Sequence, residues 1–340
     1  MKMKLKKSDR HRSLLMAAAA FATVGTASSQ EPSSFDPDYE PPLTAFGHPD
    51  LQAVWSNAIL TPLERPPEFG DQAFLTEEQA NAYRAQRLQV FDRAERQEDV
   101  ELDVSFAYND FWWDWGDDIA RTRRTSLIID PPDGRLPPLT PDAQRRREER
   151  ITHRIEHPAD GPEDRLLRER CIVWDGNNDA GAGPPMMPAS YNNNFQIVQT
   201  EDYVLLLKEM VHETRLVPLD GRPHLPSNVR QWLGSSRAHW EDSTLVIETT
   251  NLTEKTNYMG ASENMHLTER FTRVADDILL YEFTVEDPEA FESPWTAQIP
   301  TVKLDGLIYE FACHETNRGM LGLLSGARAE EAAAREASSD

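Results

Sequence analysis

The stretch from Tyr191 to Glu310 most constrains the fold of this chain, because it reads as a succession of short strands separated by turns. Its segments are rich in β-branched, aromatic and leucine residues, and turn signals such as Asp220-Gly221 and Asp276-Asp277 lie between them. Polar and charged residues interrupt the apolar ones, as in a sheet with one apolar and one polar face. The predicted strands are 195–199, 203–211, 214–218, 244–250, 265–274, 278–285 and 307–313.

We therefore expect a mainly β fold, in which an antiparallel β-barrel or strongly curled sheet is accompanied by a few peripheral helices. A lipocalin-like architecture is one form of this fold. Such a sheet could enclose a pocket for a small molecule. One hairpin makes the expectation specific: with a loop at 275–277, Val274 faces Ile278, and the same register places Phe271 opposite Tyr281. A slip of one residue would lose this matching of apolar with apolar side chains.

Other elements are predicted before this stretch. A tryptophan-containing segment, 48–55, starts the ordered chain, and 125–129 reads as a further strand. Thr76 and Gln79 have the spacing of a capping box, which predicts a helix from residue 77 to about 94. Thr140 followed by Pro141 predicts a second helix that runs to about residue 156 and is nearly all charged.

The N-terminus has the pattern of a secretion signal. Six basic residues precede the apolar run from Leu14 to Val24, and small residues follow at 27–29. We expect residues 1–29 to be a signal peptide, 30–46 an extended lead-in, 47–327 a single mainly β domain with helical insertions, and 328–340 a flexible tail. Since no later segment has the roughly 20 apolar residues of a membrane span, we expect no integral membrane segment after signal removal. The protein should be periplasmic or secreted.

Charge and cysteine content narrow the partners and the compartment. Removing a signal of net charge +5 takes the chain from −23 to −28, and such a surface repels the phosphates of nucleic acids. The two cysteines, Cys171 and Cys313, could form one disulfide in an oxidising compartment. Two unpaired buried thiols are the alternative interpretation.

Candidate catalytic residues are ionisable groups that lie within the predicted strands. His212 follows the apolar run Leu205–Leu207 and could act as a general acid or base. If that strand were regular, Lys208 and His212 would share one face, while Glu209 and Glu213 would share the other. A structural role for His212 at the end of a strand is the alternative.

A second candidate group is His266, Arg270 and Glu282, with Tyr191 as a further orienting residue. Arg270 could hold a carboxylate or a developing oxyanion if its face is internal. If that face is external, Arg270 and Glu282 form only a cross-strand ion pair.

Candidate substrate-binding residues are amides and large aromatics. Asn192 and Asn194 could face a substrate, although a turn role is the ordinary one for asparagine. Trp112 and Trp113 belong to the densest aromatic cluster of the chain and could stack on a ring, although large aromatics are more often buried in a core.

We expect neither a cofactor nor a metal. His153 and His157 are four residues apart on the charged helix and could form a surface metal pair, but a solvated helix face is the simpler interpretation. The sequence contains no phosphate loop, dinucleotide fingerprint or nucleophile elbow.

From Arg124 onward the chain resembles a large family of exported bacterial proteins of unknown function. The segments that carry the resemblance include 125–135, 191–194, 218–224, 230–234, 263–264 and 325–328, which are spread over about two thirds of the chain. The resemblance implies export and adds no catalytic residue.

These observations lead to two hypotheses. The first is a cofactor-independent lyase, isomerase or hydrolase that acts on a small aromatic or apolar molecule in the periplasm by acid–base chemistry, in the catabolism of aromatic compounds. The second is a periplasmic carrier or binding protein without catalysis. The oligomeric state does not follow from the sequence.

Overall fold

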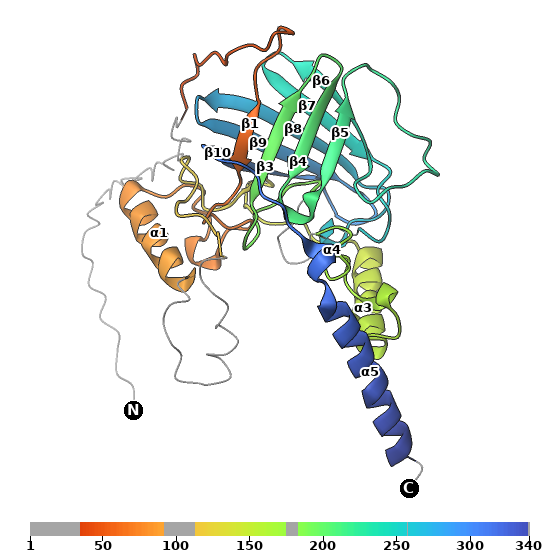
Figure 1. The fold of residues 1–340 in the computed structure, drawn as a ribbon. Coiled ribbons are helices and arrows are strands. Elements are labelled where there is room, and N and C mark those ends of the chain that lie inside the picture. The colour runs from red at the N-terminus through yellow and green to blue at the C-terminus, as the bar shows by residue number, and fades with distance from the viewer. Residues whose placement is uncertain (1–34, 92–112, 175–182, 257, 339–340) are drawn as a thin grey trace, which may run out of the picture. The chain divides into compact units, whose positions relative to one another are not determined.

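The computed structural model describes residues 35–91, 113–174, 183–256 and 258–338, which belong to one compact unit. Ten antiparallel strands form one sheet (Figure 1). Nine of them follow the order β5-β4-β3-β1-β10-β9-β8-β7-β6, and β2 pairs with β10. The strands are β1 (Ala53–Ser56), β2 (Ile128–Asp130), β3 (Asn194–Gln199), β4 (Tyr203–Lys208), β5 (Thr214–Pro218), β6 (Ser235–Glu241), β7 (Thr244–Thr250), β8 (His266–Ala275), β9 (Ile278–Glu286) and β10 (Trp295–Leu304).

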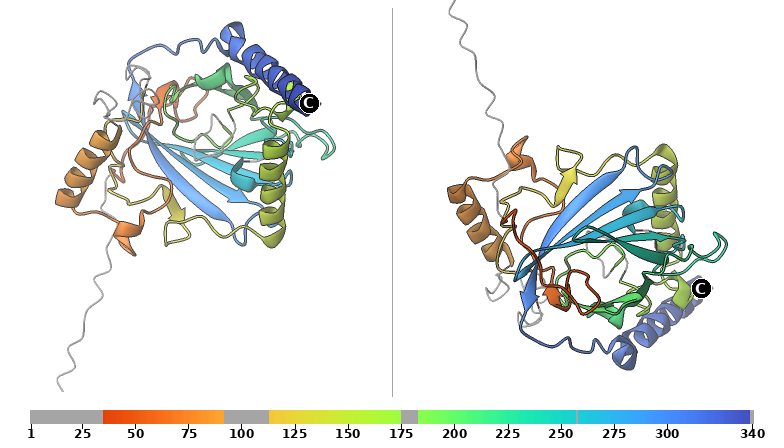
Figure 2. Two further views of the ribbon diagram at one scale, coloured as in Figure 1. Left: turned by 90° about the horizontal axis from the view of Figure 1, so that it is seen from below. Right: turned by 90° about the horizontal axis from the view of Figure 1, so that it is seen from above.

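The prediction of a mainly β protein is confirmed, but the sheet is not closed into a barrel. Its edge strands, β5 and β6, approach each other without being hydrogen-bonded neighbours, although both lie within the described residues. Figure 2 views the sheet from below and from above, and in both views the strands curve around the interior. Large side chains occupy this interior, including Trp55, Trp295, Tyr281, Phe195 and Phe271, each fully buried.

The hairpin between β8 and β9 has the predicted register along nearly its whole length. Phe271 lies opposite Tyr281, and Arg270 lies opposite Glu282. The difference is at the turn, where the register shifts between Arg273 and Ala275, so that Ala275 rather than Val274 lies opposite Ile278. Residue 274 is therefore the extra residue of a bulge, and the connection is one residue shorter than expected.

Two strands were not predicted. β6 is polar in sequence and joins β7 partly through the hydroxyl groups of Ser236 and Thr249, 2.8 Å apart. β10 contains Pro300, which has no amide proton to donate. The amide of Gln298, two residues earlier, donates to Leu127 O, so residue 300 faces the same side. On that side β10 pairs with β2 at Thr296–Ala297 and with β1 only from Val302. Pro300 therefore lies between the two partner strands, at a position where no amide proton is needed on that side.

The prediction of a strand at 307–313 is wrong. Residues 307–312 have no regular structure, and helix α4 (Cys313–Thr316) begins at the next residue. The amides of Tyr309 and Phe311 donate to side chains, Glu209 Oε1 and His212 Nε2, instead of to a neighbouring strand. The strand predicted at 203–211 ends earlier, at Lys208, because Val211 and His212 have left-handed φ angles of 59° and 52° and reverse the chain.

Both helix starts are as predicted. Helix α1 (Glu77–Phe91) carries the capping box, in which Gln79 N donates to Thr76 Oγ1 and Thr76 N donates to Gln79 Oε1. Helix α3 (Pro141–Glu156) is capped by Thr140, whose hydroxyl accepts from Ala143 N. Of α3 only Ala143 is buried, in agreement with its charged sequence. The short helices are η1 (Pro67–Phe69), η3 (Pro162–Asp164), η4 (Met210–His212) and η5 (Tyr258–Gly260).

A disulfide joins Cys171 to Cys313 across 142 residues, which confirms the pairing predicted for the two cysteines. It anchors the start of the C-terminal helices α4 and α5 (Arg318–Ala337). The boundary expected at Arg328 falls inside α5, which is continuous to Ala337. In the described part of the chain, no helix has both the length and the apolar character that crossing a membrane requires.

Candidate functional site

Two buried ionisable side chains with strongly shifted pKa values lie at the turn of the hairpin formed by β4 and β5. Lys208 and Glu213 are directly opposite each other where the hairpin turns, since Lys208 N donates to Glu213 O and Leu207 pairs with Thr214. Residues opposite each other in an antiparallel pair point to the same side of the sheet. The alternation that would place Lys208 and His212 on one face assumes a regular strand, and β4 ends at Lys208 before the chain turns at Val211 and His212.

Lys208 is buried and held by two oxygen acceptors. Its Nζ donates to Asn57 Oδ1 at 3.1 Å and to Asn193 O at 3.2 Å. Burial lowers the pKa of the Lys208 amine to about 7, against the opposing effect of nearby carboxylates, of which Glu209 contributes most. Near neutral pH this amine can therefore accept or release a proton.

Glu213 is buried as well. One carboxyl oxygen, Oε1, accepts from Trp174 N at 3.2 Å, while Oε2 has no hydrogen-bond partner among the described residues. Burial raises the pKa of the Glu213 carboxyl to about 8, so this group retains its proton at neutral pH. We call Lys208, Glu213, Asn57 and Asn193 the buried polar cluster. It contains two proton-transfer groups whose pKa values lie near neutrality.

A second buried network lies deeper between β5, β8 and β9. Arg215 donates to both carboxyl oxygens of Glu269, with Nη1–Oε2 at 2.5 Å and Nη2–Oε1 at 2.9 Å. The Tyr281 hydroxyl donates to Glu269 Oε1 at 2.7 Å and accepts from Met186 N. Although burial opposes the charge, Glu269 raises the pKa of the Arg215 guanidinium, and burial raises the pKa of the Tyr281 hydroxyl. Each of these groups has partners, so the network is suited to holding strands together.

Four predicted site residues lie close to the buried polar cluster. Asn194 Nδ2 donates to Glu209 Oε2 at 2.8 Å, and His212 Nε2 accepts from Phe311 N at 3.0 Å. Tyr191 and Trp113 belong to an aromatic group whose rings lie 5.8–6.4 Å apart and whose members are Trp113, Trp174, Tyr191 and Phe311. Asn192 has φ 53°, the turn conformation that asparagine tolerates. Trp112 lies outside the described residues.

The other predicted catalytic residues are not brought to this cluster. His266, Arg270 and Glu282 occupy the partly exposed alternate positions of β8 and β9, on the face opposite the core. His266 pairs with Glu286 at 3.2 Å, Arg270 pairs with Glu241 at 2.7 Å, and Glu282 accepts from Gln298 at 3.1 Å. Their surroundings are those of surface polar pairs.

The residues that sequence reasoning missed carried a recognisable signal. In the predicted hairpin register, Glu269 falls in the same row as Leu267 and Phe271, which is the apolar row. A charged residue in an apolar row must be paired when it is buried. The cluster of Lys208 and Glu213 had a weaker signal, because its geometry depends on where β4 ends.

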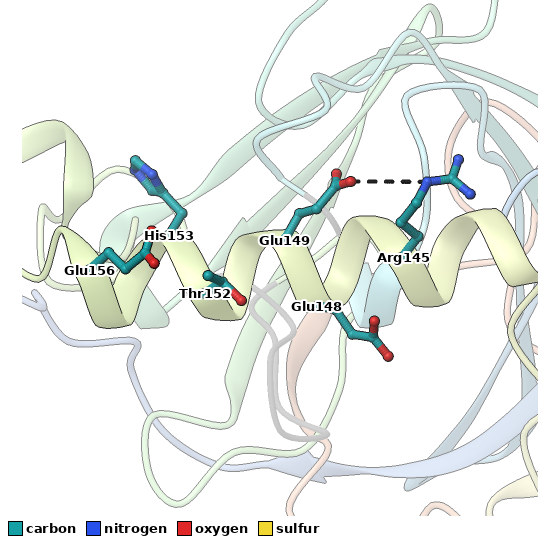
Figure 3. Close-up of a pocket in the computed structure, with 6 residues that line it drawn as sticks. All are labelled: Arg145, Glu148, Glu149, Thr152, His153 and Glu156. Atoms are coloured by element: carbon teal, nitrogen blue, oxygen red, sulfur yellow. Dashed lines mark ion pairs between the residues drawn. The ribbon is translucent and has the colours of Figure 1, made fainter.

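Two hollows adjoin ionisable residues. One, of about 260 Å³, lies beside the hairpin and is lined by Leu207, Lys208, Glu209, His212, Ile308, Tyr309 and Glu310. The other, of about 390 Å³, lies along α3, where Figure 3 shows Arg145 and Glu149 as an ion pair among six side chains of this one helix. No other element of the described chain walls the α3 hollow, so we assign no site to it.

The described residues contain no group of three or more His, Cys, Asp or Glu side chains placed to hold a metal ion. His153 and His157 lie with ring centroids 4.8 Å apart, and each also contacts a carboxylate, Asp164 and Asp160 respectively. Comparison with known proteins found no matching family model, no matching curated protein and no matching solved structure.

Proposed function

We propose that this protein is an exported, cofactor-independent enzyme, a lyase, isomerase or hydrolase, that acts on a small aromatic or otherwise apolar molecule. Lys208 and Glu213 are its proton-transfer groups. The observation that carries the proposal is the buried pair across β4 and β5, with a pKa of about 7 for the amine and about 8 for the carboxyl. Catalytic acids and bases work best when their pKa lies near the operating pH.

Lys208 and Glu213 could serve as the base and the acid of the reaction, respectively. Between pH 7 and pH 8 a neutral Lys208 amine can remove a proton, while the protonated Glu213 carboxyl can donate one. Structural groups also acquire shifted pKa values, but here the two shifted groups lie directly opposite each other across β4 and β5, and Glu213 Oε2 has no hydrogen-bond partner among the described residues. In this proposal His212 and Tyr191 lie at the margin of the site and act as orienting residues.

The aromatic group supports the class of substrate. Trp113, Trp174, Tyr191 and Phe311 offer ring faces and edges, and the backbone amide of Trp174 also donates to Glu213. Aromatic side chains in such arrangements favour planar, apolar guests. A lignin-type aromatic is therefore the class that we would test first.

Export is part of the proposal. The disulfide supports an oxidising compartment, of which the periplasm is the example that fits the signal-like start of the chain. Membership of a family of exported bacterial proteins is proposed on the same grounds.

A mass-spectrometric assay tests the catalytic proposal. The purified protein is incubated with a panel of small aromatic compounds at pH 7.5, and the compounds are analysed before and after. We expect Lys208→Met and Glu213→Gln to reduce turnover by at least about a hundredfold, the usual contribution of an acid–base group. Arg270→Ala, on the opposite face of the sheet, is the matched control and should retain turnover. Full turnover in both cluster variants would refute the assignment.

The second candidate function is carriage of a small molecule. It is favoured by the same aromatic group, because clustered aromatic side chains are suited to apolar guests without any need for acid–base chemistry. In the assay above, a compound that binds stoichiometrically and is recovered unchanged would favour the carrier over the enzyme.

A further inference from the structure

Residues 308–311 cross the hairpin of β4 and β5 as an irregular segment, which we call the strap. The strap and the hairpin together line the 260 Å³ hollow. Two backbone amides of the strap donate to side chains of the hairpin: Tyr309 N to Glu209 Oε1 at 3.1 Å and Phe311 N to His212 Nε2 at 3.0 Å. The strap is therefore held by two side-chain acceptors.

The two acceptors differ in their chemistry. Glu209 is buried, and its other oxygen accepts from Asn194 Nδ2, so this carboxylate is fixed on both sides. His212 is exposed and follows Val211 in a left-handed turn. An imidazole nitrogen can accept a hydrogen bond only when it carries no proton. The bond from Phe311 N therefore requires a neutral His212 with its proton on Nδ1.

We propose that His212 is a pH-sensitive latch, which holds the strap over the hollow when its imidazole is neutral and releases the strap when Nε2 is protonated. Release removes the acceptor for Phe311 N and replaces it with a second donor, so the bond becomes a repulsive contact. Histidine is the side chain whose charge ordinarily changes between pH 5 and pH 8. The stacking of Phe311 on Tyr191 is lost with the same movement.

Several ionisable groups face the latch and could shape its response. Lys208 and Glu209 of the hairpin and Tyr309 and Glu310 of the strap line the hollow together with His212. Glu213 follows His212 directly in the chain. Of these groups only Glu209 contributes a second acceptor to the strap, so it is the group that the experiment must separate from His212.

The far end of the strap is tethered, which limits the movement to a short segment. Cys313, two residues after Phe311, is bonded to Cys171. Beyond it, Asn317 Nδ2 donates to Glu169 O, and Arg328 donates to Ala159 O and Asp160 O. The strap can therefore open while α5 stays attached.

Hydrogen–deuterium exchange of the full chain measures the protection of the strap amides directly. The result does not depend on the proposed function. Peptides that cover 305–312 are followed at pH 7.5 and pH 5.5, and rates are corrected for intrinsic exchange. Loss of one hydrogen bond should reduce protection of this segment about threefold to tenfold at pH 5.5 in the wild type. Equal corrected protection at both pH values would overturn the proposal.

Variants assign the effect to His212. His212→Gln supplies an oxygen acceptor at either pH, so its strap should stay protected at pH 5.5, whereas His212→Ala should be deprotected at both. His266→Gln, at a histidine of β8 that pairs with Glu286 rather than with the strap, should respond like the wild type. Glu209→Gln should also keep the pH response. If the response disappears in Glu209→Gln and persists in His212→Gln, Glu209 is the latch and the proposal is wrong.

Discussion

Arg215 on β5 and Glu269 on β8 form a two-pronged ion pair, although five strands lie between β5 and β8 in the order of the sheet. In a flat sheet, six steps of about 4.8 Å would separate the two strands by about 29 Å. The sheet must therefore curl until β5 faces β8 across the interior. The ion pair fixes this curl at a point where no backbone ladder joins the two strands.

Removing one partner of this pair should be strongly destabilising. We expect Glu269→Met or Arg215→Met to lower the free energy of unfolding by about 3–5 kcal/mol, because each leaves a buried group without its partner. The double variant Arg215→Met/Glu269→Met should cost less than the sum of the single changes. Urea unfolding of the four proteins measures this. Additive single costs would show that the pair makes no coupled contribution.

The hydroxyl of Tyr281 completes the network and can be removed with little change in shape. Tyr281→Phe removes the donor to Glu269 Oε1 and the acceptor for Met186 N. We expect a loss of about 1–3 kcal/mol in the free energy of unfolding, since the partners stay buried. Tyr203→Phe, at a partly exposed tyrosine that contacts Arg222, is the matched control and should lose much less. Equal losses would contradict a special role for the buried hydroxyl.

Lys208 and Glu213 should impose opposite pH dependences on stability. The Lys208 pKa is about 7 in the folded chain, against an ordinary value of 10.5 for an exposed lysine, so the unfolded chain binds more protons between these values and stability rises with pH there. The Glu213 pKa is about 8 folded against 4.5, so the folded chain binds more protons in that window and stability falls as pH rises. Together the two groups should lower the free energy of unfolding from pH 4.5 to 7, leave it constant from pH 7 to 8, and raise it above pH 8.

Difference curves isolate these two contributions from the rest of the chain. Each slope has an upper limit of about 1.4 kcal/mol per pH unit. Lys208→Met should remove the contribution that raises stability between pH 7 and 10.5, and Glu213→Gln should remove the contribution that lowers it between pH 4.5 and 8. Lys303→Met changes an exposed lysine and should leave the curve unchanged. Urea unfolding at pH 5, 7.5 and 9.5 tests all four proteins. A Lys208→Met curve parallel to that of the wild type would mean that the amine titrates normally.

Local signals in the sequence predicted local structure well. The capping box at Thr76, the start of α3 and the register of β8 with β9 away from its turn each depend on residues that are near in sequence, and each is confirmed. The positions of the buried ionisable groups depend on where strands end and on contacts between residues that are far apart in sequence. One turn at Val211 and His212 moved Glu213 to the side of Lys208, and the curl of the sheet brought Arg215 to Glu269.

The alternation of polar and apolar residues along β8 and β9 does not tell whether the polar face is internal, and the catalytic residues predicted on that face are not brought to the buried polar cluster. His266, Arg270 and Glu282 were candidates because their face of the strands could have been internal, and the structure places them in partly exposed pairs. The buried residue of the same strand, Glu269, has a partner on β5, which no local pattern could identify. A charged residue within the apolar row was therefore more informative than a matched pair outside it.

The disulfide should contribute more to attachment of the C-terminal segment than to the sheet. Crosslinking across 142 residues restricts the unfolded chain by up to about 5 kcal/mol in the loop-entropy model. We expect Cys171→Ser/Cys313→Ser to unfold at lower urea concentration and to expose residues 305–338 to proteolysis before the sheet unfolds, because α5 has no buried residue. Limited proteolysis with mass spectrometry, with and without a dithiol, checks the order of events. Simultaneous loss of the sheet and the C-terminal segment would show that α5 is part of the same cooperative unit as the strands.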